Sequence, residues 1–288
     1  MSTLVNRFAP FDDALMAAFE ANLLAALLED VGTGDLTGEL VPAGGRMQAR
    51  VIVREDAILC GAPWFEAIMR AMDAAIDVTW HYAEGDAMAA DSVVCSIAGP
   101  ARALLTGERS ALNFLQLLSG VATATRRYVD VVAGTDAAIL DTRKTLPGLR
   151  LAQKYAVRVG GGQNQRLALY DGILIKENHI AAAGGVTAAL VAAKRLDAGV
   201  TIQVEVENLT ELSEALEAGA ISILLDNFDL DLMREAVRLN AGRAMLEASG
   251  GVNLDTVRAI AETGVHRISI GSLTKDIRAT DYSLRVVV

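Results

Sequence analysis

Cysteine and histidine are scarce in this chain of 288 residues, which contains two cysteines and three histidines. Cys60 and Cys95 stand far apart and form no CxxC or paired Cys/His spacing. The pattern excludes a disulfide-stabilised secreted scaffold and argues against a metal site built from histidine or cysteine. We therefore expect reduced thiols in a cytoplasmic protein.

The sequence also lacks a long hydrophobic run and an excess of basic charge. No apolar run reaches the roughly 20 residues of a membrane-spanning helix, so no membrane partner is expected. The 26 Lys and Arg are outnumbered by 36 Asp and Glu, and the net charge of −10 argues against nucleic acid as a partner. The hydrophobic fraction of 52% is enough for the core of a barrel, with or without a smaller domain.

The basic residues that are present lie mostly in the middle of the chain. Residues 107–176 hold ten Lys or Arg and five acids, so this window carries +5 and the rest of the chain −15. A cationic middle in an acidic chain indicates a site that concentrates a small anionic ligand. Arg143, Lys144 and Lys176 follow apolar runs, which a solvated basic helix face does not explain.

The first part of the chain shows both helical and strand-like spacing of its apolar residues. The predicted helices cover 11–28, 62–72 and 107–133, and the predicted strands cover 46–54, 78–82 and 92–97. We expect a bend in the third helix near Ser119-Gly120. Strands followed by strands with few helices describe an α+β domain over roughly residues 1–110.

From residue 137 onward, strand-like and helix-like segments alternate regularly. This order predicts an α/β fold with parallel strands and right-handed crossovers, and apolar runs such as 221–225 indicate burial on both faces. The predicted strands are 137–141, 172–176, 201–206, 221–225, 244–248 and 266–270. The helices between them lie near 149–159, 183–196, 208–218, 229–239 and 253–263.

Polar residues or glycines follow each predicted strand. A parallel barrel places its active site at the C-terminal ends of its strands, so six such ends in succession favour a barrel enzyme. An open doubly wound sheet is the alternative, although no GxGxxG follows a first strand. In order, the strand ends are Thr142-Arg143-Lys144, Lys176, Glu205 with Glu207, Asp226-Asn227, Ser249-Gly250-Gly251 and Gly271-Ser272.

These strand ends suit a ligand that carries carboxylates or phosphates. Glu205 and Asp226, without His or Cys nearby, suit Mg²⁺ shared with a phosphate, and the glycine-containing loops offer backbone N–H groups to phosphate. The sequence contains no GxSxG, HExxH or Walker motif, which leaves Lys176 as a rival Schiff-base lysine. The cations available to clamp an anion are Arg143, Lys144, Arg166 and Lys176.

A series of short motifs runs through nearly the whole chain. They are Glu29-Asp30-x-x-x-Gly34-Asp35-x-Thr37, Asp141-Thr142-Arg143-Lys144-Thr145-x-Pro147-Gly148, Lys154-Tyr155-Ala156, Gly160-Gly161-Gly162-x-Asn164-x-Arg166, Lys176-Glu177-Asn178-His179, Val204-Glu205-Val206-Glu207-Asn208, Leu225-Asp226-Asn227-Phe228, Ser249-Gly250-Gly251-Val252 and Gly271-Ser272-Leu273-Thr274. In residues, order and spacing, the chain resembles the quinolinate phosphoribosyltransferase family, also called nicotinate-nucleotide pyrophosphorylase (carboxylating).

The resemblance implies transfer of a 5-phosphoribosyl group from phosphoribosyl pyrophosphate to the nitrogen of quinolinate. Carbon dioxide and pyrophosphate would leave, and nicotinate mononucleotide would form in the de novo route to NAD. It also implies an N-terminal α/β sandwich domain over 1–115, joined by the C-terminal segment 276–288. An irregular TIM-like α/β barrel of fewer than eight strands would cover 116–275, and two copies would form a homodimer.

The resemblance also assigns roles to residues by position. Arg109 would enter the partner's pocket to meet quinolinate, while Lys144 would lie near phosphoribosyl pyrophosphate. The implied catalytic residues are Lys144, Lys176, Glu205 and Asp226, the last two also holding Mg²⁺ and the ribose. The implied substrate-binding residues are Arg109, Thr142, Arg143, Lys144, Gln165, Arg166, Lys176, Glu205, Asp226, Ser249, Gly250, Gly251, Ile270, Gly271 and Ser272. We expect His179 to support the structure.

Three other functions stay open at this point. A related phosphoribosyltransferase could act on another heterocyclic carboxylate, and a barrel lyase could use Lys176 as a Schiff base. Borohydride trapping of Lys176 with a carbonyl substrate would identify the lyase. The third alternative is a non-catalytic anion-binding protein, against which the pair of Glu205 and Asp226 argues.

Gln165 departs from the family pattern, which usually has histidine at this position. Glutamine can hydrogen-bond a carboxylate but carries no charge, so we expect weaker quinolinate binding with little pH dependence near neutrality. Gln165→His should lower the KM for quinolinate and make it depend on pH between about 6 and 7, where histidine titrates. An unchanged affinity and an unchanged pH profile would show the inference to be wrong.

Overall fold

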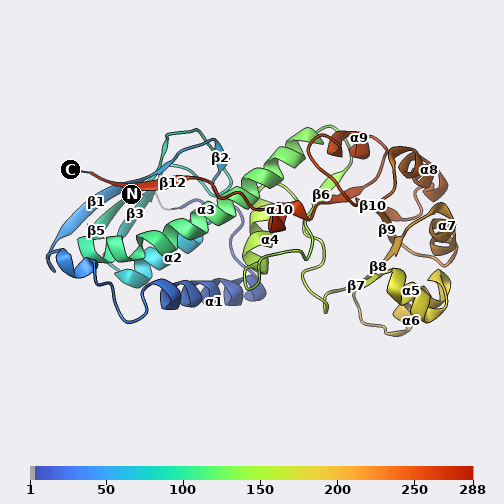
Figure 1. The fold of residues 1–288 in the computed structure, drawn as a ribbon, viewed down its shortest axis with the longest axis horizontal. Coiled ribbons are helices and arrows are strands. Elements are labelled where there is room, and N and C mark those ends of the chain that lie inside the picture. The colour runs from blue at the N-terminus through green and yellow to red at the C-terminus, as the bar shows by residue number, and fades with distance from the viewer. Residues whose placement is uncertain (1–3, 288) are drawn as a thin grey trace. The chain divides into compact units, whose positions relative to one another are not determined.

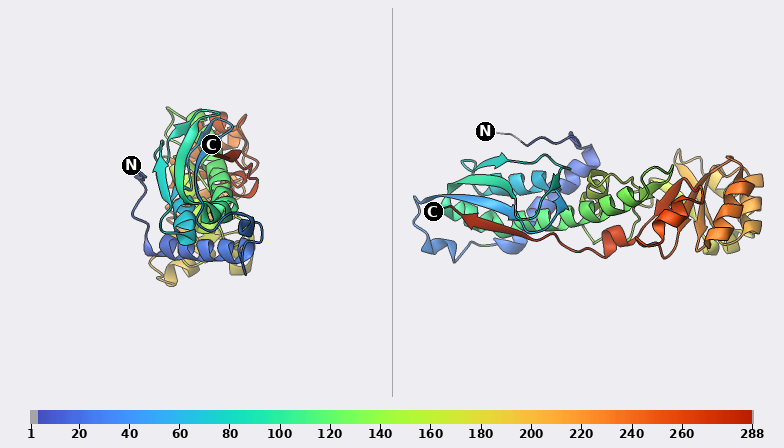
Figure 2. Two further views of the ribbon diagram at one scale, coloured as in Figure 1. Left: turned by 90° about the vertical axis from the view of Figure 1, so that its left-hand side faces the viewer. Right: turned by 90° about the horizontal axis from the view of Figure 1, so that it is seen from above.

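The chain passes back and forth between two units (Figures 1 and 2). The computed structural model describes residues 4–287. Of these, unit 1 comprises the residues up to Arg126, Thr145–Gly161 and the residues from Thr274 onward, and unit 2 comprises Arg127–Lys144 and Gly162–Leu273. The domain boundary near residue 115 stays a prediction. The return of residues 145–161 to unit 1 is a feature that the sequence analysis did not anticipate.

Unit 1 is built on a four-stranded antiparallel sheet. The strand order is β12-β1-β5-β3, so the C-terminal strand pairs with β1, from Val53↔Tyr282 to Ala49↔Val286. Helices α2 and α3 lie on one face of the sheet (Figure 1), where the fully buried Phe65 of α2 packs edge-on against Trp80 of β3. The elements are α1 (Asp13–Asp30), η1 (Gly38–Leu40), β1 (Arg46–Val53), β2 (Ala57–Ile58), α2 (Ala62–Met72), β3 (Asp77–Trp80), β4 (Ala87–Met88), β5 (Val93–Pro100), α3 (Ala101–Val131), α4 (Arg150–Val159) and β12 (Tyr282–Val286).

Two glycines allow close contacts with the long helix α3. The helix continues through Gly120, the position of the expected bend, where a Cβ atom would clash with the carbonyl oxygen of Arg278. At Gly160, which follows α4, a Cβ atom would lie 2.5 Å from the carbonyl oxygen of Ala122. Glycine at these positions therefore lets the C-terminal segment and α4 pack directly against the backbone of α3.

Unit 2 contains a six-stranded parallel sheet with the order β6-β11-β10-β9-β8-β7. An isolated parallel bridge, Leu140↔Gln163, adds to its β6 side. All six strands predicted after residue 137 are present within one or two residues of the expected bounds. They are β6 (Ala138–Leu140), β7 (Gly172–Ile175), β8 (Thr201–Val206), β9 (Ser222–Asp226), β10 (Met245–Ser249) and β11 (Arg267–Ser269).

The two faces of this sheet differ in chemistry. Val204, Ile223 and Leu246 follow one another in register across β8, β9 and β10 and are completely buried. Side chains alternate along a strand, so the neighbours Glu205 and Glu247 lie on the opposite face. Both faces of these strands are buried, as expected, but one face is apolar and the other is polar.

Helices connect the parallel strands of unit 2, and Figure 1 shows α7 and α8 lying outside the strands. Most of these helices are the expected ones, but α5 and α10 were not predicted. The helices are α5 (Glu177–Ala183), α6 (Val186–Arg195), α7 (Leu209–Glu217), α8 (Leu230–Asn240), α9 (Val257–Ala261) and α10 (Ser272–Lys275). Among residues 4–287, no helix has the length and apolar character needed to cross a membrane.

A buried carboxylate connects three elements of unit 1. Glu84 is completely buried and accepts hydrogen bonds from the backbone N–H groups of Gly61 (2.8 Å) and Ala62 (3.1 Å) at the start of α2. The hydroxyl of Tyr155, on α4, donates to the same carboxylate at 3.0 Å. Burial raises the pKa of Glu84 to about 7, although these three hydrogen bonds favour the ionised form and oppose the shift.

The raised pKa of Glu84 predicts that unit 1 loses stability as the pH rises. The unfolded chain releases this proton near pH 4.5 and the folded chain near pH 7, so the contribution of Glu84 is complete below pH 4.5 and is lost as the pH rises through 7. The pKa difference corresponds to a loss on the order of 3 kcal/mol in the free energy of unfolding. Urea unfolding measures the free energy of unfolding at pH 5 and at pH 8. The decrease between these two pH values should be smaller for Glu84→Gln than for the wild type.

A matched control is Glu235→Gln, which removes an exposed carboxylate from α8. Its pH dependence should follow that of the wild type. Parallel curves for Glu84→Gln and the wild type would contradict the predicted role of Glu84.

Candidate active site

A polar cavity of about 160 Å³ lies at the C-terminal ends of the parallel strands in unit 2. Its walls come from every strand of the sheet, either from the strand itself or from the residues that follow it. The lining residues are Thr142, Arg143, Lys144, Gln165, Arg166, Leu174, Lys176, Glu205, Leu224, Glu247, Ser249 and Ser269. We refer to this space as the strand-end cavity.

Strand register explains why these side chains share one cavity. Glu205 on β8 pairs with Leu224 on β9, which pairs with Glu247 on β10. The three therefore lie in one row on the polar face, and residues two positions further along each strand lie on the same face, closer to the strand ends. Ser249 is such a residue, and Asp226 is paired with it in register.

Two arginines in the cavity repel each other. Burial and the nearby guanidinium of Arg143 lower the pKa of Arg166, while the charge of Asp171 opposes this effect. Arg166 donates from Nη1 to the carbonyl of Gly172 at 2.9 Å. The Nε atom of Arg143 is buried and has no hydrogen-bond partner within residues 4–287. Two cations at short range with an unused buried donor form a site that an anion would stabilise.

Lys176 pairs with an acid at the end of the neighbouring strand. Its Nζ lies 3.2 Å from Oε2 and 3.4 Å from Oε1 of Glu205, which is 9% exposed. Burial raises the pKa of Glu205, the hydrogen bond and charge of Lys176 lower it, and the charges of Asp226 and Glu177 raise it. The ion pair places the Lys176 amino group in the cavity wall beside Glu205.

His179 supports the backbone near Lys176. Its Nδ1 atom accepts a hydrogen bond from the backbone N–H of Lys176 at 3.0 Å, in the first turn of α5. The ring nitrogen that faces the backbone must therefore be the unprotonated one. This contact confirms the expectation that His179 supports the structure.

Asp141 organises the segment that follows α4. It is completely buried at the end of β6, where Oδ1 accepts from the backbone N–H of Gln165 (2.9 Å) and Oδ2 from the side chain of Asn164 (2.6 Å). Its position thereby determines where Gln165 and Arg166 enter the cavity. Asp141, the first residue of the predicted motif at 141–148, therefore positions the cavity residues through hydrogen bonds to the segment that carries them.

Backbone conformation explains two of the glycine-containing strand ends. Gly250 has a φ of +106°, and a Cβ atom there would collide with the side chain of Asn227, whose backbone N–H donates to Ser249 at 3.0 Å. At Gly271, a Cβ atom would lie 3.1 Å from Cδ of Lys144. Both loops therefore approach other strand ends more closely than a larger residue allows.

The structure brings eight of the predicted site residues into the strand-end cavity: Thr142, Arg143, Lys144, Gln165, Arg166, Lys176, Glu205 and Ser249. The loops and strand ends around it contribute others, namely Asp226, Gly250, Gly251, Ile270, Gly271 and Ser272. Arg109 belongs to unit 1, where it is exposed on α3 and lines a separate hollow of about 730 Å³.

Sequence reasoning missed three polar residues on the buried face of the sheet. Gln203 and Glu247 are 5% and 1% exposed, and Arg267 pairs with Glu247 in register. The signal was the alternation of polar and apolar residues in TIQVEV, MLEAS and RIS, the sequences of β8, β10 and β11. These residues lie inside the strands, whereas the prediction used only the residues at the strand ends.

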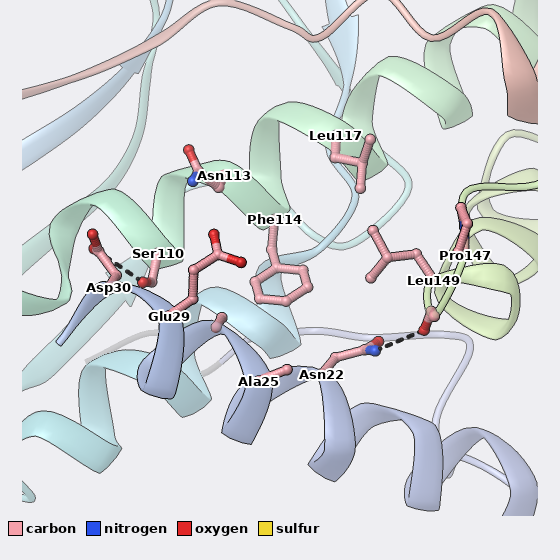
Figure 3. A pocket seen from close by; sticks show the side chains of 12 residues that line it. Asn22, Ala25, Glu29, Asp30, Ser110, Asn113, Phe114, Leu117, Pro147 and Leu149 are labelled. Atoms are coloured by element: carbon pink, nitrogen blue, oxygen red, sulfur yellow. Dashed lines mark hydrogen bonds between the residues drawn. The ribbon is translucent and has the colours of Figure 1, made fainter. Parts of the chain in front are cut away.

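A larger cavity of about 370 Å³ lies in unit 1 between α1, α3 and the turn at Pro147 (Figure 3). Its polar groups bond to each other, with Ser110 donating to Asp30 at 3.3 Å and Asn22 donating to the carbonyl of Gly148 at 3.1 Å. No Lys or Arg is among its lining residues. The predicted cations Arg143, Lys144, Arg166 and Lys176 line the smaller cavity in unit 2 and not this one.

The chain is similar to proteins of one enzyme family. Sequence profiles of the N-terminal and C-terminal domains of quinolinate phosphoribosyl transferase match residues 35–119 and 121–285. A probable nicotinate-nucleotide pyrophosphorylase (carboxylating) of Bacillus subtilis (strain 168) is 42% identical, with 90% of each chain covered. The chloroplastic nicotinate-nucleotide pyrophosphorylase (carboxylating) of Arabidopsis thaliana is 38% identical, with 93% of this chain and 82% of that one covered. The solved structure of the nicotinate-nucleotide pyrophosphorylase from Francisella tularensis has a TM-score of 0.92 and 41% identity, covering 97% of this chain and 99% of that one.

Proposed function

The chain belongs to the quinolinate phosphoribosyltransferase family, and on that premise we propose which of its residues perform the reaction. The enzyme transfers a phosphoribosyl group to quinolinate with decarboxylation, which gives nicotinate mononucleotide for NAD biosynthesis. The donor is phosphoribosyl pyrophosphate. The observation that supports the strand-end cavity as the site is the presence of Arg143, Arg166 and Lys176 in its wall.

Quinolinate binds through its two carboxylates in this proposal. The positive charges of Arg166 and Arg143 repel each other, and a bound dianion would offset this repulsion. The buried Nε of Arg143 supplies a hydrogen-bond donor that has no protein partner in the described chain. Lys176 adds a third cation, while Thr142 and Gln165 complete the wall. Charge-assisted hydrogen bonds to such donors are about twice as strong as neutral ones, so the ligand is held mainly by charge.

The phosphoribosyl donor occupies the remaining strand ends. Lys144 faces its phosphates, and the backbone N–H groups of Ser249–Gly251 and Ile270–Ser272 bind the 5-phosphate. Within residues 4–287, no three or more His, Cys, Asp or Glu side chains converge on a metal site. Glu205 and Asp226 nevertheless fit Mg²⁺, because their like charges raise the pKa of Glu205 and Mg²⁺ needs only one or two carboxylates beside phosphate oxygens.

Positioning and charge then account for the chemistry. The pyridine nitrogen attacks the ribosyl C1 atom while pyrophosphate leaves, and bound Mg²⁺ supplies positive charge to the leaving group. Loss of the 2-carboxylate as carbon dioxide leaves an electron pair at C2 beside the positive nitrogen, where a proton replaces the carboxylate. Arg143 and Arg166 hold the ring in place during both steps. Lys176 needs no nucleophilic role, and its ion pair with Glu205 argues against a Schiff-base lyase.

A closed barrel and a two-layer sandwich are the proposed architectures of the two units. The strand order from β6 to β7 and the parallel bridge Leu140↔Gln163 support a sheet that curls towards closure with fewer than eight regular strands. The four-stranded sheet with helices on one face supports the sandwich. A cytoplasmic location is proposed from Cys60 and Cys95, which are free and buried.

A homodimer with shared sites is proposed from the surroundings of Arg109. The hollow that this exposed arginine lines has apolar walls, and Leu36 and Leu40 within it are 90% and 83% exposed. Exposed leucines of this kind are typical of a surface that another subunit covers. The partner's barrel would then place its quinolinate site against Arg109.

The purified protein should release carbon dioxide from quinolinate only when phosphoribosyl pyrophosphate and Mg²⁺ are both present. Asp226→Asn should raise the Mg²⁺ concentration needed for half-maximal activity by about tenfold or more, because one of two carboxylates is lost. Steady-state assays over a Mg²⁺ titration measure both effects. Turnover of a different heterocyclic carboxylate, with none of quinolinate, would favour the related transferase instead.

Complementation tests the shared site. Arg109→Gln and Arg143→Gln should each be nearly inactive, but co-refolding the two variants should restore about a quarter of the wild-type activity. Half of the dimers formed at random are mixed, and each mixed dimer has one intact site out of two. Recovery would fail if Arg109 served the site of its own subunit, and two preparations of the same variant mixed together serve as the control.

A further inference from the structure

A hydrogen-bonded chain of three polar side chains leads from the buried face of the sheet to the wall of the strand-end cavity. Gln165 donates from Nε2 to Oε1 of Gln203 at 2.8 Å, and Gln203 donates from Nε2 to Oε2 of Glu247 at 2.9 Å. Gln203 is 5% exposed and Glu247 is 1% exposed. Gln165 and Glu247 both line the strand-end cavity. The chain therefore links two walls of the cavity through Gln203, which lies beneath them on β8.

The carboxylate determines the direction of every hydrogen bond in this chain. An ionised Glu247 can only accept, so Gln203 must turn its NH₂ group towards it and its carbonyl oxygen towards Gln165. Gln165 must then turn its own NH₂ group towards that oxygen. Burial raises the pKa of Glu247, while the hydrogen bond from Gln203, the nearby hydroxyl of Ser269, the charge of Arg267 and the nearby amide of Gln165 lower it.

Within residues 4–287, one oxygen of Glu247 is left unsatisfied inside the sheet. Its Oε1 atom is buried without a hydrogen-bond partner in the described part of the chain. A buried carboxylate oxygen without a donor is unfavourable by roughly 1–3 kcal/mol or more. A glutamine at this position could turn its NH₂ group towards Gln203, so it would not fix the orientation of Gln203 as a carboxylate does.

We propose that Glu247 and Gln203 are positioning residues that fix the side-chain amide of Gln165 for quinolinate binding. The inference rests on the proposed function, because it takes Gln165 to contact quinolinate beside Arg166. A free amide can turn over and present either its oxygen or its nitrogen to the ligand. Held by Gln203, the amide of Gln165 presents a single arrangement, which removes the ordering cost from the binding step.

The same chain restricts which residues can occupy position 165. Because Gln203 offers a carbonyl oxygen, the residue at 165 must donate a hydrogen bond. Glutamine meets this condition, and so does histidine through one ring N–H. Glutamate at this position would place a carboxylate oxygen against the carbonyl oxygen of Gln203. Gln203 therefore restricts position 165 to residues that donate a hydrogen bond, although Gln203 itself does not contact the ligand.

A double-mutant cycle tests the coupling in the full-length enzyme. The KM for quinolinate, the KM for phosphoribosyl pyrophosphate and kcat are measured for wild type, Gln165→Ala, Glu247→Gln and the double variant. Glu247→Gln should raise the KM for quinolinate by about 2- to 10-fold, the value of one hydrogen bond, with a smaller change in kcat. In the Gln165→Ala background, Glu247→Gln should have almost no further effect, because the group it positions is gone.

A second variant and a control make the outcome decisive. Gln203→Met removes the link between the two walls with a side chain of similar length, and it should show the same loss of effect in the Gln165→Ala background. Glu84→Gln, a buried carboxylate of unit 1, should lower the melting temperature but leave the KM for quinolinate unchanged. Independent, multiplicative effects on KM in an enzyme that still turns over quinolinate would overturn this inference alone, as would an unchanged KM in Gln165→Ala. Failure of the wild type to use quinolinate would overturn the proposed function as well.

Discussion

Side chains alternate along a strand, and the parallel sheet of unit 2 depends on this constraint for both stability and binding. Every second residue contributes to the apolar face, which the connecting helices cover, as Val204, Ile223 and Leu246 do. The residues between them have no choice but to face the other side. There they can be polar at little risk to the apolar core, and this separation allows acids, amides and cations to be placed close together.

Charge repulsion within the cavity is tolerated because the sheet, and not the cavity, supplies the stability. Burial and the charge of Arg143 lower the pKa of Arg166, while burial and the charge of Asp226 raise the pKa of Glu205. Each pair is unfavourable alone, and each is relieved by a ligand of the complementary charge. A site that carries both kinds of strain suits the proposed pair of ligands, a dianion and a phosphate bound to a metal ion.

The sequence allowed the elements and most strand-end residues to be predicted, because helical and strand periodicity are local properties. Thr142, Arg143, Lys176 and Glu205 were found since they directly follow or end apolar runs. Gln203 and Glu247 were not, because their partners lie on other strands and only the register brings them together. That α4 belongs to unit 1 could not be predicted for a related reason. The pattern of an amphipathic helix shows that one face is buried, but not which of two cores it packs against.

The chain crosses between the units at four places, near residues 126, 144, 161 and 273. Two of these crossings flank α4. The first directly follows Lys144, and the second lies shortly before Gln165. The segments that carry Arg143, Lys144 and Arg166 therefore lie on either side of residues 145–161, which belong to unit 1. No single cut yields two separable modules, and exchange of one unit between relatives would require four compatible junctions. Recombination at a single point therefore cannot exchange one complete unit for that of a relative.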